Sequence, residues 1–368
     1  MNSAPSFLAG YRALDLTDLK GQLCGRVLAD LGMKVIKIEP PGGDPVRTLR
    51  PFKESPDGSK LSCAFAHLNA NKSSVALDLE SEAGREEFCR LVERTDVVLE
   101  SFAPSFLPSI GLGYERLASL NPRLVMASIS GFGQSGPRRN VTCTDIVALA
   151  MSGLLYIAGD PSLPPCKPPE TQAYYFGSLF AALGVVAALY RRARTGRGDH
   201  ADVSMQEALA TQEHIIRLFA NDGQVLKRQG SQHGQVAPAR IFPCRDGYVY
   251  LYVTRQHWKL FLDIWADHPA ELDAPEWQNN LYRRDKVDQI NRWVESFTTE
   301  HTKQELTELL QSKGLPCTPV NSPGDFVRDE QVKSRGFAAD VEYPEFGKLA
   351  QPAAPFLIDG ERPAVHPA

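Results

Sequence analysis

The stretch "YRALDLTDLKGQLCGRVLADLGMKVIKIEPP", Tyr11–Pro41, decides the fold class of this chain. Its first seven letters predict a short strand. Gly21 to Gly32 has apolar residues at helical spacing and ends on a glycine, and Lys34 to Pro41 predicts a β-branched strand that prolines end. So tight a strand–helix–strand connection implies parallel strands and a right-handed crossover. The N-terminus is therefore predicted to be a β-α-β unit.

Strands and helices continue to alternate after this unit. "NKSSVALDLES" predicts a strand, "EAGREEFCRLVERT" an amphipathic helix capped by Ser81, "DVVLESF" a strand, "YERLASLN" a helix and "RLVMASISGFG" a strand. The alternation predicts an α/β fold with an open, doubly wound, Rossmann-like sheet. "GFGQSG", Gly131–Gly136, matches the dinucleotide fingerprint, but Pro137 follows where a helix should begin. A turn is expected there.

The segment from Ala173 to Tyr190 carries no charge and is almost long enough to span a membrane. It is rich in Gly, Ala, Ser and Tyr, which favours close helix packing. A helix from about Tyr175 to Arg194 is predicted, apolar on all sides and therefore buried, with a stop at Gly196. The membrane is not an expected partner. The residues 199–220 then predict a strand end followed by a helix.

The pattern of predicted elements changes after Gly230. Arg240–Val253 predicts a hairpin of two alternating strands about Arg245-Asp246-Gly247, and helices are expected to follow as far as Lys313. The segment "GLPCTPVNSP" predicts a strand that returns to the large sheet. The chain is thus divided into a large α/β domain, 1–205 plus 312–368, and a smaller α+β domain, 206–311.

Composition excludes several classes of protein. The 368 residues are 43% hydrophobic and 23% charged, which is typical of a soluble globular protein. The net charge of -4 and the pI near 6.1 argue against nucleic acid as a partner. The seven cysteines are scattered without C-x-x-C spacing and the eight histidines form no H-E-x-x-H motif. Reduced thiols, a cytoplasmic location and no metal site are expected.

Several longer motifs carry a resemblance to a known family. They are "VIKIEPPGGDPVR", "NANKSSVALDL", "ESFAPSFLPSIGLGYERLASLNPRLVMASISGFGQSGP", "ALYRRARTGRGDHADVSMQEA", "IFPCRDGYVYLYV" and "LPCTPVNSPGDF". In this order, nearly end to end, the chain resembles the family III CoA-transferases, which include formyl-CoA and carnitine-CoA transferases and α-methylacyl-CoA racemases. The resemblance implies a ring-like chain interlocked with a second ring in a dimer, CoA bound along the large domain and the acyl group at the domain interface.

The resemblance also implies a nucleophilic carboxylate, which attacks an acyl-CoA thioester to give a mixed anhydride. In the family this aspartate lies just before the long apolar helix. Counting back from Thr195 to that position reaches Ala173 or Tyr174, and neither is a carboxylate. The racemase branch has a histidine where this chain has Thr144, so proton exchange on two faces of a substrate is not favoured.

Two carboxylates lie near the expected position and are the candidate catalytic residues. Glu170 precedes it by a few residues in a loop, where its longer side chain could swing in; the alternative is a solvated loop residue. Asp145 matches an aspartate that many members of the family carry, and the alternative is a cap for the helix "IVALAMSG".

The resemblance places CoA beside a further set of residues. Phe102 matches, Ser101 replaces the family's asparagine, Gly21 matches a glycine loop without its proline, and the arginine pair would meet phosphates unless it serves only solubility. The expected CoA-binding residues are Gly21, Leu77, Asp78, Ser101, Phe102, Arg138 and Arg139.

Three functions follow from these observations. The first is a CoA-transferase that acts on an acyl-CoA and a small carboxylic acid, with Glu170 or an unexpected group as nucleophile. The second is a non-catalytic subunit, interlocked with a paralogous chain that bears the aspartate. The third is an acyl-CoA lyase, hydratase or epimerase that forms no covalent anhydride. The dimer is accordingly a homodimer or a heterodimer.

Overall fold

The computed structural model describes residues 6–211 and 219–368. The chain forms two compact units. Unit 1 comprises Met1–Leu155, Lys167–Leu226 and Glu330–Ala368, and unit 2 comprises Tyr156–Cys166 and Lys227–Asp329. The predicted small domain spans 206–311, whereas unit 2 includes a short segment before the long helix and continues to Asp329.

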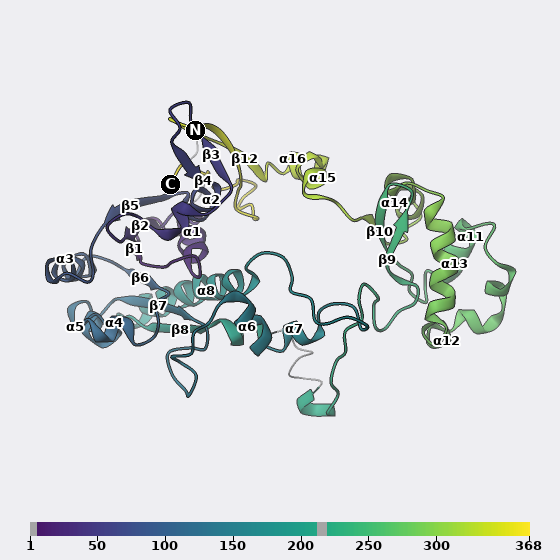
Figure 1. The fold of residues 1–368 in the computed structure, drawn as a ribbon, viewed down its shortest axis with the longest axis horizontal. Helices are drawn as coiled ribbons and strands as arrows, with labels where there is room; N and C mark the ends of the chain where they lie inside the picture. The colour runs from purple at the N-terminus through teal and green to yellow at the C-terminus, as the bar shows by residue number, and fades with distance from the viewer. Residues whose placement is uncertain (1–5, 212–218) are drawn as a thin grey trace. The chain divides into compact units, whose positions relative to one another are not determined.

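A six-stranded parallel sheet forms the framework of unit 1 (Figure 1). In spatial order its strands are β5 (Lys72–Ala76), β2 (Lys34–Glu39), β1 (Arg12–Asp15), β6 (Val97–Glu100), β7 (Val125–Ser130) and β8 (His200–Ser204). The chain begins in the middle, adds β2 and β5 on one side and then β6, β7 and β8 on the other. This is the order of a doubly wound, Rossmann-like sheet. The predicted α/β class is confirmed.

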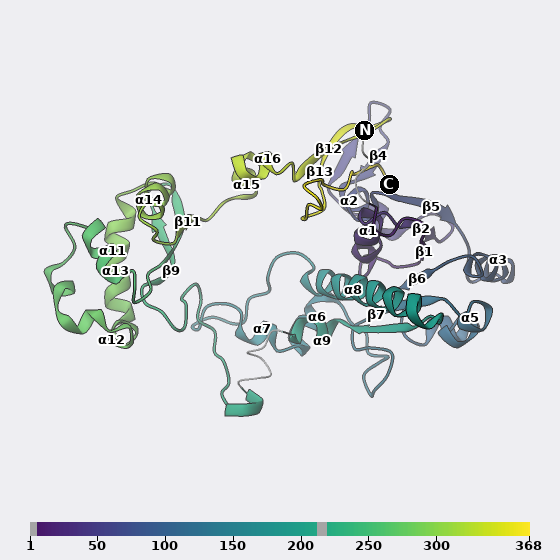
Figure 2. The same ribbon diagram turned by 180° about the vertical axis from the view of Figure 1, so that it is seen from behind.

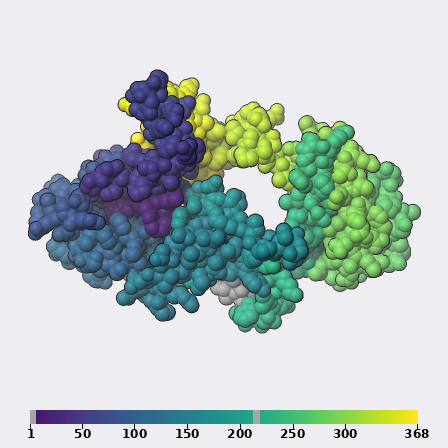
Figure 3. All heavy atoms as spheres, in the orientation of Figure 1, coloured from purple at the N-terminus to yellow at the C-terminus, as the bar shows by residue number. Residues whose placement is uncertain are grey.

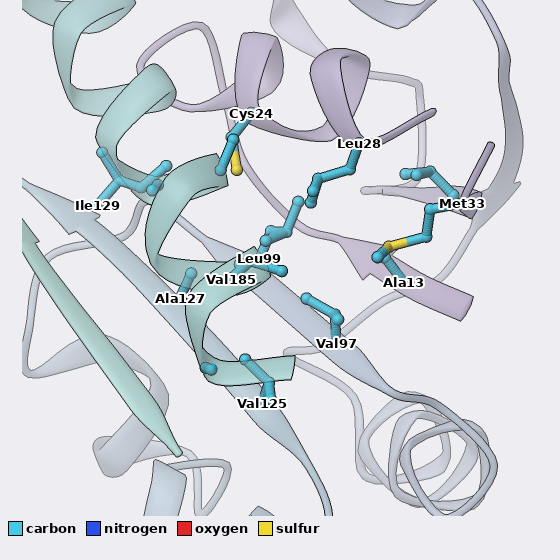
Figure 4. Packing of buried hydrophobic residues seen from close by; sticks show 14 of the residues in the cluster. Ala13, Cys24, Leu28, Met33, Val97, Leu99, Val125, Ala127, Ile129 and Val185 are labelled. Carbon is cyan, nitrogen blue, oxygen red and sulfur yellow. The ribbon is translucent and has the colours of Figure 1, made fainter. Parts of the chain in front are cut away.

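One face of the sheet is covered by α1 (Gln22–Asp30) and α8 (Gln172–Thr195). Figure 2 shows α8 running along β7 and β8. Leu28 of α1 and Val185 of α8 pack on Leu99 and Ala127 of the strands, and all four are fully buried (Figure 4). Alternate residues of a strand point to opposite faces, so this core takes every second strand residue.

The opposite face is covered by α3 (Glu82–Val92), α5 (Tyr114–Leu120) and the short α4 (Phe106–Ser109). Phe88 of α3 and Leu117 of α5 are fully buried in the core with Val98 of β6. The Ser81 hydroxyl accepts a hydrogen bond from Gly84 N at 3.0 Å, which confirms the predicted cap. Helices on both faces make the sheet doubly wound.

The prediction that the long apolar helix is buried on all sides is wrong. Only the face of α8 that carries small residues packs against the sheet and its neighbours. Leu179, Leu183, Val186 and Tyr190 on the other face are 51%, 62%, 36% and 69% exposed. A helix that is apolar all round does not reveal which of its faces the same chain covers. The helix ends where expected, with Gly196 in the left-handed region at φ 74°.

By length and composition α8 could cross a membrane, and 44% of its apolar window is buried inside the protein. The core helices of soluble proteins pass the same test. Its contacts with α1, β7, β8 and α9 (Met205–Ala210) place it in the core of unit 1. The predicted strand end and helix of 199–220 are found as β8 and α9, and residues 212–218 lie outside the described residues.

Several smaller elements of unit 1 were not predicted. They are η1 (Pro45–Thr48), β3 (Phe52–Glu54), β4 (Lys60–Ser62), α2 (Cys63–Asn69), β12 (Ala338–Tyr343) and β13 (Gly347–Pro352). Val341 and Tyr343 of β12 pack on Ala66 of α2, and Leu61 of β4 packs against the same cluster. The C-terminal segment therefore lies against α2 and the β3–β4 pair (Figure 3). "GFGQSG" is a bent segment, the predicted turn follows at 137–140, and the next helices are α6 (Asp145–Met151) and α7 (Leu154–Ile157).

Unit 2 is an antiparallel sheet packed on helices. The predicted hairpin is confirmed as β9 (Ala239–Cys244) and β10 (Gly247–Tyr252). The helices are α11 (Trp258–Ile264), α12 (Asn280–Asp285), α13 (Val287–Thr299), α14 (Lys303–Gln311), η2 (Ala270–Asp273), η3 (Pro275–Gln278) and α15 (Pro323–Arg328); α16 (Glu330–Ser334) belongs to unit 1. Trp258, Phe261 and Val294 form the centre of the core.

The strand in "GLPCTPVNSP" was expected to return to the large sheet, and this is wrong. It forms β11 (Cys317–Pro319), which pairs antiparallel with β10 in unit 2, Val249 opposite Pro319. A strand of three residues carries no pattern that specifies its pairing partner. Its proximity to α14, whose Leu310 shares the core with Cys317, determines the pairing.

Candidate functional site

A pocket of about 420 Å³ lies at the carboxyl ends of the strands of unit 1. It is lined by residues 16–18 after β1, 37–41 at the end of β2, 77–80 after β5, and by Phe102 and Phe106 after β6. The strand order changes direction between β1 and β6, and ligands of doubly wound sheets bind at that edge. We call this cavity the strand-end pocket.

The structure brings four of the predicted CoA-binding residues together here. Leu77, Asp78 and Phe102 line the strand-end pocket. Ser101 lies beside it, where its hydroxyl donates to Asp18 Oδ1 at 2.8 Å and accepts from Asp18 N at 2.9 Å. These contacts fix the loop after β1 to the end of β6.

The remaining predicted CoA residues lie elsewhere. Gly21 precedes α1, where an added Cβ would come within 2.7 Å of the Thr17 side chain, so the close approach of this loop requires glycine. Arg138 and Arg139 are exposed in the turn after β7. Arg139 lines a different cavity, with residues 103–115 and the strands β6, β7 and β8, and Arg138 lines neither cavity.

Buried charges hold one wall of the strand-end pocket in place. Lys37 Nζ lies 2.9 Å from Asp44 Oδ2 and donates to the carbonyl oxygen of Thr17, and both side chains of the ion pair are nearly fully buried. Gln22 Nε2 also donates to Asp44 Oδ2, at 2.8 Å. Buried ion pairs are tolerated when further hydrogen bonds satisfy them. This network fixes the loop between β2 and η1.

Glu39 at the end of β2 is held ionised by its neighbours. Arg47 Nε and Nη2 donate to its two carboxylate oxygens at 2.7 Å each, the Ser74 hydroxyl donates as well, and Asp44 N donates at 2.7 Å. Burial alone would raise the pKa of Glu39, but these hydrogen bonds outweigh it and lower the pKa to about 2. So firmly bound a carboxylate serves structure rather than nucleophilic attack.

A second buried pair lies deeper. Lys72 Nζ contacts Asp15 Oδ2 at 2.7 Å, Gln22 O at 2.8 Å and Asn69 Oδ1 at 2.9 Å. Burial by itself raises the pKa of Asp15, but the charges of Lys72 and Lys37 lower it, with the help of hydrogen bonds, and the net shift is downward. Neither pair could be predicted from the sequence, because Asp15 and Lys72 lie on different strands and Lys37 meets Asp44 only through the fold of the loop after β2.

The start of α8 gathers both predicted catalytic carboxylates. Asp145 Oδ1 accepts from Ala173 N at 2.8 Å, Asp145 Oδ2 lies 3.4 Å from Lys167 Nζ, and the Tyr174 hydroxyl accepts from Asp145 N at 3.2 Å. Asp145 is buried and caps α8 rather than its own helix, α6, whose N-cap residue is Thr144. It is therefore fixed in place on several sides.

Glu170 lies two residues before α8 and is exposed. Its backbone is in the left-handed region, with φ 60°, and Lys167 donates to its carbonyl oxygen. Such a backbone is unusual for a residue other than glycine and is found at functional sites and in turns. The side chain is free of the fixed geometry that holds Asp145.

One further group near Tyr174, the Cys143 thiol, was not singled out from the sequence. Cys143 packs so closely on Gly131 that an added Cβ there would come within 2.5 Å of its Sγ. Burial raises the pKa of the Cys143 thiol, although the backbone N–H of Ala148 and the Lys20 ammonium oppose the shift. The thiol, rather than the thiolate, is therefore the form at neutral pH. Loops far apart in sequence bring these side chains together.

The comparisons with known proteins match almost the whole chain. The model of CoA-transferase family III covers residues 8–368. Subunit BbsE of the succinyl-CoA:(R)-benzylsuccinate CoA-transferase of Thauera aromatica is 32% identical over 92% of this chain and 88% of its own length. The succinate–glutarate CoA-transferase of Agrobacterium fabrum is 33% identical over 91% and 85%, and the formyl-CoA:oxalate CoA-transferase of Streptomyces avermitilis 31% over 95% and 89%.

Solved structures agree with this likeness. A CAIB/BAIF family protein from Brucella suis superposes with a TM-score of 0.88 at 29% identity, covering 99% of this chain and 95% of that one. The protein Rv3272 from Mycobacterium tuberculosis gives a TM-score of 0.84 at 26% identity, covering 99% and 96%. With a family match from end to end and relatives above 30% identity, this chain belongs to CoA-transferase family III.

Proposed function

We propose that this protein moves CoA between an acyl-CoA and a small carboxylic acid, with part of the CoA held in the strand-end pocket. The observation that carries the proposal is the end-to-end family match, together with a pocket at the strand ends lined by Leu77, Asp78 and Phe102. The relatives named above are CoA-transferases for small acids. The proposal needs no metal ion.

The lining of the pocket indicates which part of CoA it would take. Phe102, Phe106 and Leu77 offer apolar surface, whereas Asp18, Asp78 and Glu80 give the lining acidic character. Carboxylates repel phosphates, so the apolar and hydrogen-bonding parts of CoA would lie inside and its phosphates outside.

We propose Glu170 as the nucleophile. A Glu170 oxygen would attack the thioester carbonyl and the C–S bond would break. CoA would depart as the thiolate, and a mixed anhydride between Glu170 and the acyl group would form. The thiolate would then attack the glutamyl carbonyl, which forms a glutamyl-CoA thioester and releases the first acid. The acceptor carboxylate would attack this thioester to form a second anhydride and free the thiolate. The thiolate would attack the acceptor's acyl carbon, which gives the new acyl-CoA and regenerates Glu170. Asp145 is less suited because Ala173 N and Lys167 already hold its oxygens. Each exchange is nearly thermoneutral, as in other covalent acyl transfers.

A second function is supported by one observation. The relative from Thauera aromatica is named as a subunit of its transferase. This chain has Ala173 and Tyr174 where the resemblance implies the aspartate. A paralogous partner that carries the aspartate would then supply the chemistry, and this chain would supply structure.

We further propose a dimer, with a second copy or with a paralogue. The exposed apolar face of α8 supports it, because large exposed apolar patches mark interaction surfaces. We also propose a cytoplasmic location, supported by scattered cysteines without C-x-x-C spacing.

The test is to incubate the purified chain with isotopically labelled acyl-CoA and a carboxylic acid, and to measure CoA exchange and covalent adducts by mass spectrometry. Native protein and Asp145→Asn should exchange CoA and form an adduct on a peptide that contains Glu170, while Glu170→Gln should do neither. Exchange that survives Glu170→Gln would rule out Glu170. A chain that is inactive alone and active only with a paralogue would favour the subunit.

A further inference from the structure

A second cavity, of about 620 Å³, lies apart from the strand-end pocket. Its floor is formed by Glu100 of β6, Met126 and Ser128 of β7 and His200 of β8, on the face of the sheet that α3 and α5 cover in part. Its walls are the segment 103–115 and the turn after β7, which carries Gln134 and Arg139. We call it the His200 cavity.

Among the described residues, α4 and the start of α5 cover this end of the sheet only in part, which leaves the cavity. The chain that follows β7 passes through α6 to α8, and α8 packs on the opposite face. The turn after β7 folds over the bare strands instead, where Gln134 N donates to the Asp202 carboxylate oxygens at 2.9 and 3.0 Å. The faces of a parallel sheet are usually apolar, because helices cover them. This one carries a buried carboxyl, a hydroxyl and an imidazole.

These three groups form a hydrogen-bonded series. Phe102 N donates to Glu100 Oε2 at 2.8 Å, and the Ser128 hydroxyl donates to the same carboxyl group. His200 Nε2 lies 2.8 Å from Ser128 Oγ, within hydrogen-bond distance of the hydroxyl. Tyr114 stacks on His200 with ring centroids 4.8 Å apart. Glu100 is 3% exposed and Ser128 is 1% exposed, so the series is built into the core.

Protonation determines the charge of the floor. Burial raises the pKa of Glu100 to about 7, although the donors Ser128 and Phe102 N and the nearby Lys20 oppose the shift and Asp202 adds to it. Burial also lowers the pKa of His200. Below neutral pH the Glu100 carboxyl group is therefore mostly neutral, and burial disfavours a positive charge on the His200 imidazole beside it.

The remaining polar groups of the cavity are mainly donors. Gln134 Nε2 is buried and has no hydrogen-bond partner among the described residues. Arg139 adds an exposed guanidinium, and Tyr114 adds a hydroxyl. The Glu115 side chain also lines the cavity, and it is exposed. Leu107 and Met126 supply apolar surface.

We propose that the His200 cavity binds a small monocarboxylate, with its carboxylate held by Arg139 and Gln134 Nε2 and its carbon chain on Leu107 and Met126. Arginine forks bind carboxylates bidentately. The protonated Glu100 carboxyl can donate to the ligand, whereas an ionised Glu100 repels it. One cation in the lining favours one negative charge over two. The site is separate from the strand-end pocket and does not depend on the transferase proposal.

The test uses Met126 as a reporter inside the cavity. The full chain is labelled on its methionine methyl groups, butyrate is titrated at about pH 6, and methyl NMR is recorded; Met126→Leu identifies the signal. The Met126 methyl should shift in a saturable way while those of Met33 and Met205, which lie in the other core, stay in place. Butyramide and inorganic phosphate are the comparison probes, and neither should reproduce the shift. No Met126 shift with butyrate, or an equal shift with phosphate, overturns the proposal.

The variants separate the roles of the residues. Arg139→Gln should weaken the binding of butyrate at least about tenfold, which corresponds to about 1.4 kcal/mol. Arg138→Gln, which changes the adjacent arginine outside the cavity, should leave the affinity for butyrate unchanged. In the native protein, raising the pH from about 6 to about 8.5 should weaken the binding of butyrate at least about fivefold, because Glu100 ionises. Glu100→Gln should bind equally at both pH values. Equal effects of the two arginine variants, or a pH dependence that survives Glu100→Gln, contradict the assignment.

Discussion

At the scale of single residues, Glu100 has the clearest consequence for stability. Its pKa is raised by burial from 4.5 to about 7, so the folded protein binds its proton more tightly than the unfolded chain does. The stabilisation from this group is complete below pH 4.5 and is lost as the pH rises through about 7. A pKa difference of this size corresponds to about 3 kcal/mol at most.

Glu100→Gln should therefore change how stability depends on pH. Urea unfolding at about pH 5 and about pH 8 should show that the native protein loses about 1–3 kcal/mol more than the variant does over this interval. Because only the difference between the two proteins is compared, other titrating groups cancel. Parallel curves for the two proteins would mean that Glu100 ionises at its ordinary pKa.

Asp145 is the second residue with a definite expectation. Its carboxylate accepts from Ala173 N at the start of α8, so Asp145→Ala leaves that N–H without its cap. Loss of a helix cap costs about 0.5–2 kcal/mol. Thermal unfolding should show a lower midpoint for Asp145→Ala and a smaller loss for Asp145→Asn, whose amide oxygen can still accept. Equal stability of all three proteins would show that the cap contributes nothing.

At the scale of elements, the start of α8 allows a test of whether an aspartate placed there can act as the nucleophile. Tyr174 is the third residue of this helix and is partly exposed, whereas Ala173 is fully buried. A carboxylate is favoured in the first turn of a helix, so Tyr174→Asp should fold, and Ala173→Asp, which buries a charge beside Asp145, should not. If the rest of the site is intact, Tyr174→Asp should gain CoA exchange.

Circular dichroism checks that each variant is folded, and the exchange assay is run only on folded protein. Tyr174→Asn, of the same shape but without the charge, is the control and should stay at the native level. Equal exchange by the Asp and Asn variants would show that the position does not support a nucleophile.

The sequence predicted the elements better than their surroundings. Periodicity and glycine stops identify β1, α1, β2 and the hairpin of unit 2, because local spacing determines them. The exposed face of Leu183 and Tyr190 could not be predicted, because both sides of α8 are equally apolar in sequence. The pairing of β11 with β10 depends on contacts that three residues do not encode.

The candidate site was predicted only in part. Leu77, Asp78 and Phe102 lie in one pocket because each follows a parallel strand, and strand ends meet at one edge of a sheet. Glu100, Ser128 and His200 lie on three neighbouring strands, and each looks like an ordinary strand residue in the sequence. Their proximity is a property of register, which a single sequence does not specify.

At the scale of the whole molecule, the exposed face of α8 requires an explanation. Leu179, Leu183, Val186 and Tyr190 repeat at helical spacing, and each is more than a third exposed. Single exposed apolar residues are common, but a stripe on one helix of this length is typical of an interaction surface. A dimer through this surface is consistent with the proposed association.

Sedimentation of the native protein at micromolar concentration should give a species of twice the chain mass of 40.6 kDa. Leu183→Glu puts a charge in the middle of the stripe, and burying it at an interface costs several kcal/mol unless it is paired. This variant should dissociate or aggregate. Leu281→Glu in unit 2, where the residue is 60% exposed outside the stripe, should stay dimeric. A native chain that sediments as a monomer contradicts the dimer. A native dimer that Leu183→Glu leaves intact would place the interface on another surface, because the charge would then remain in solvent.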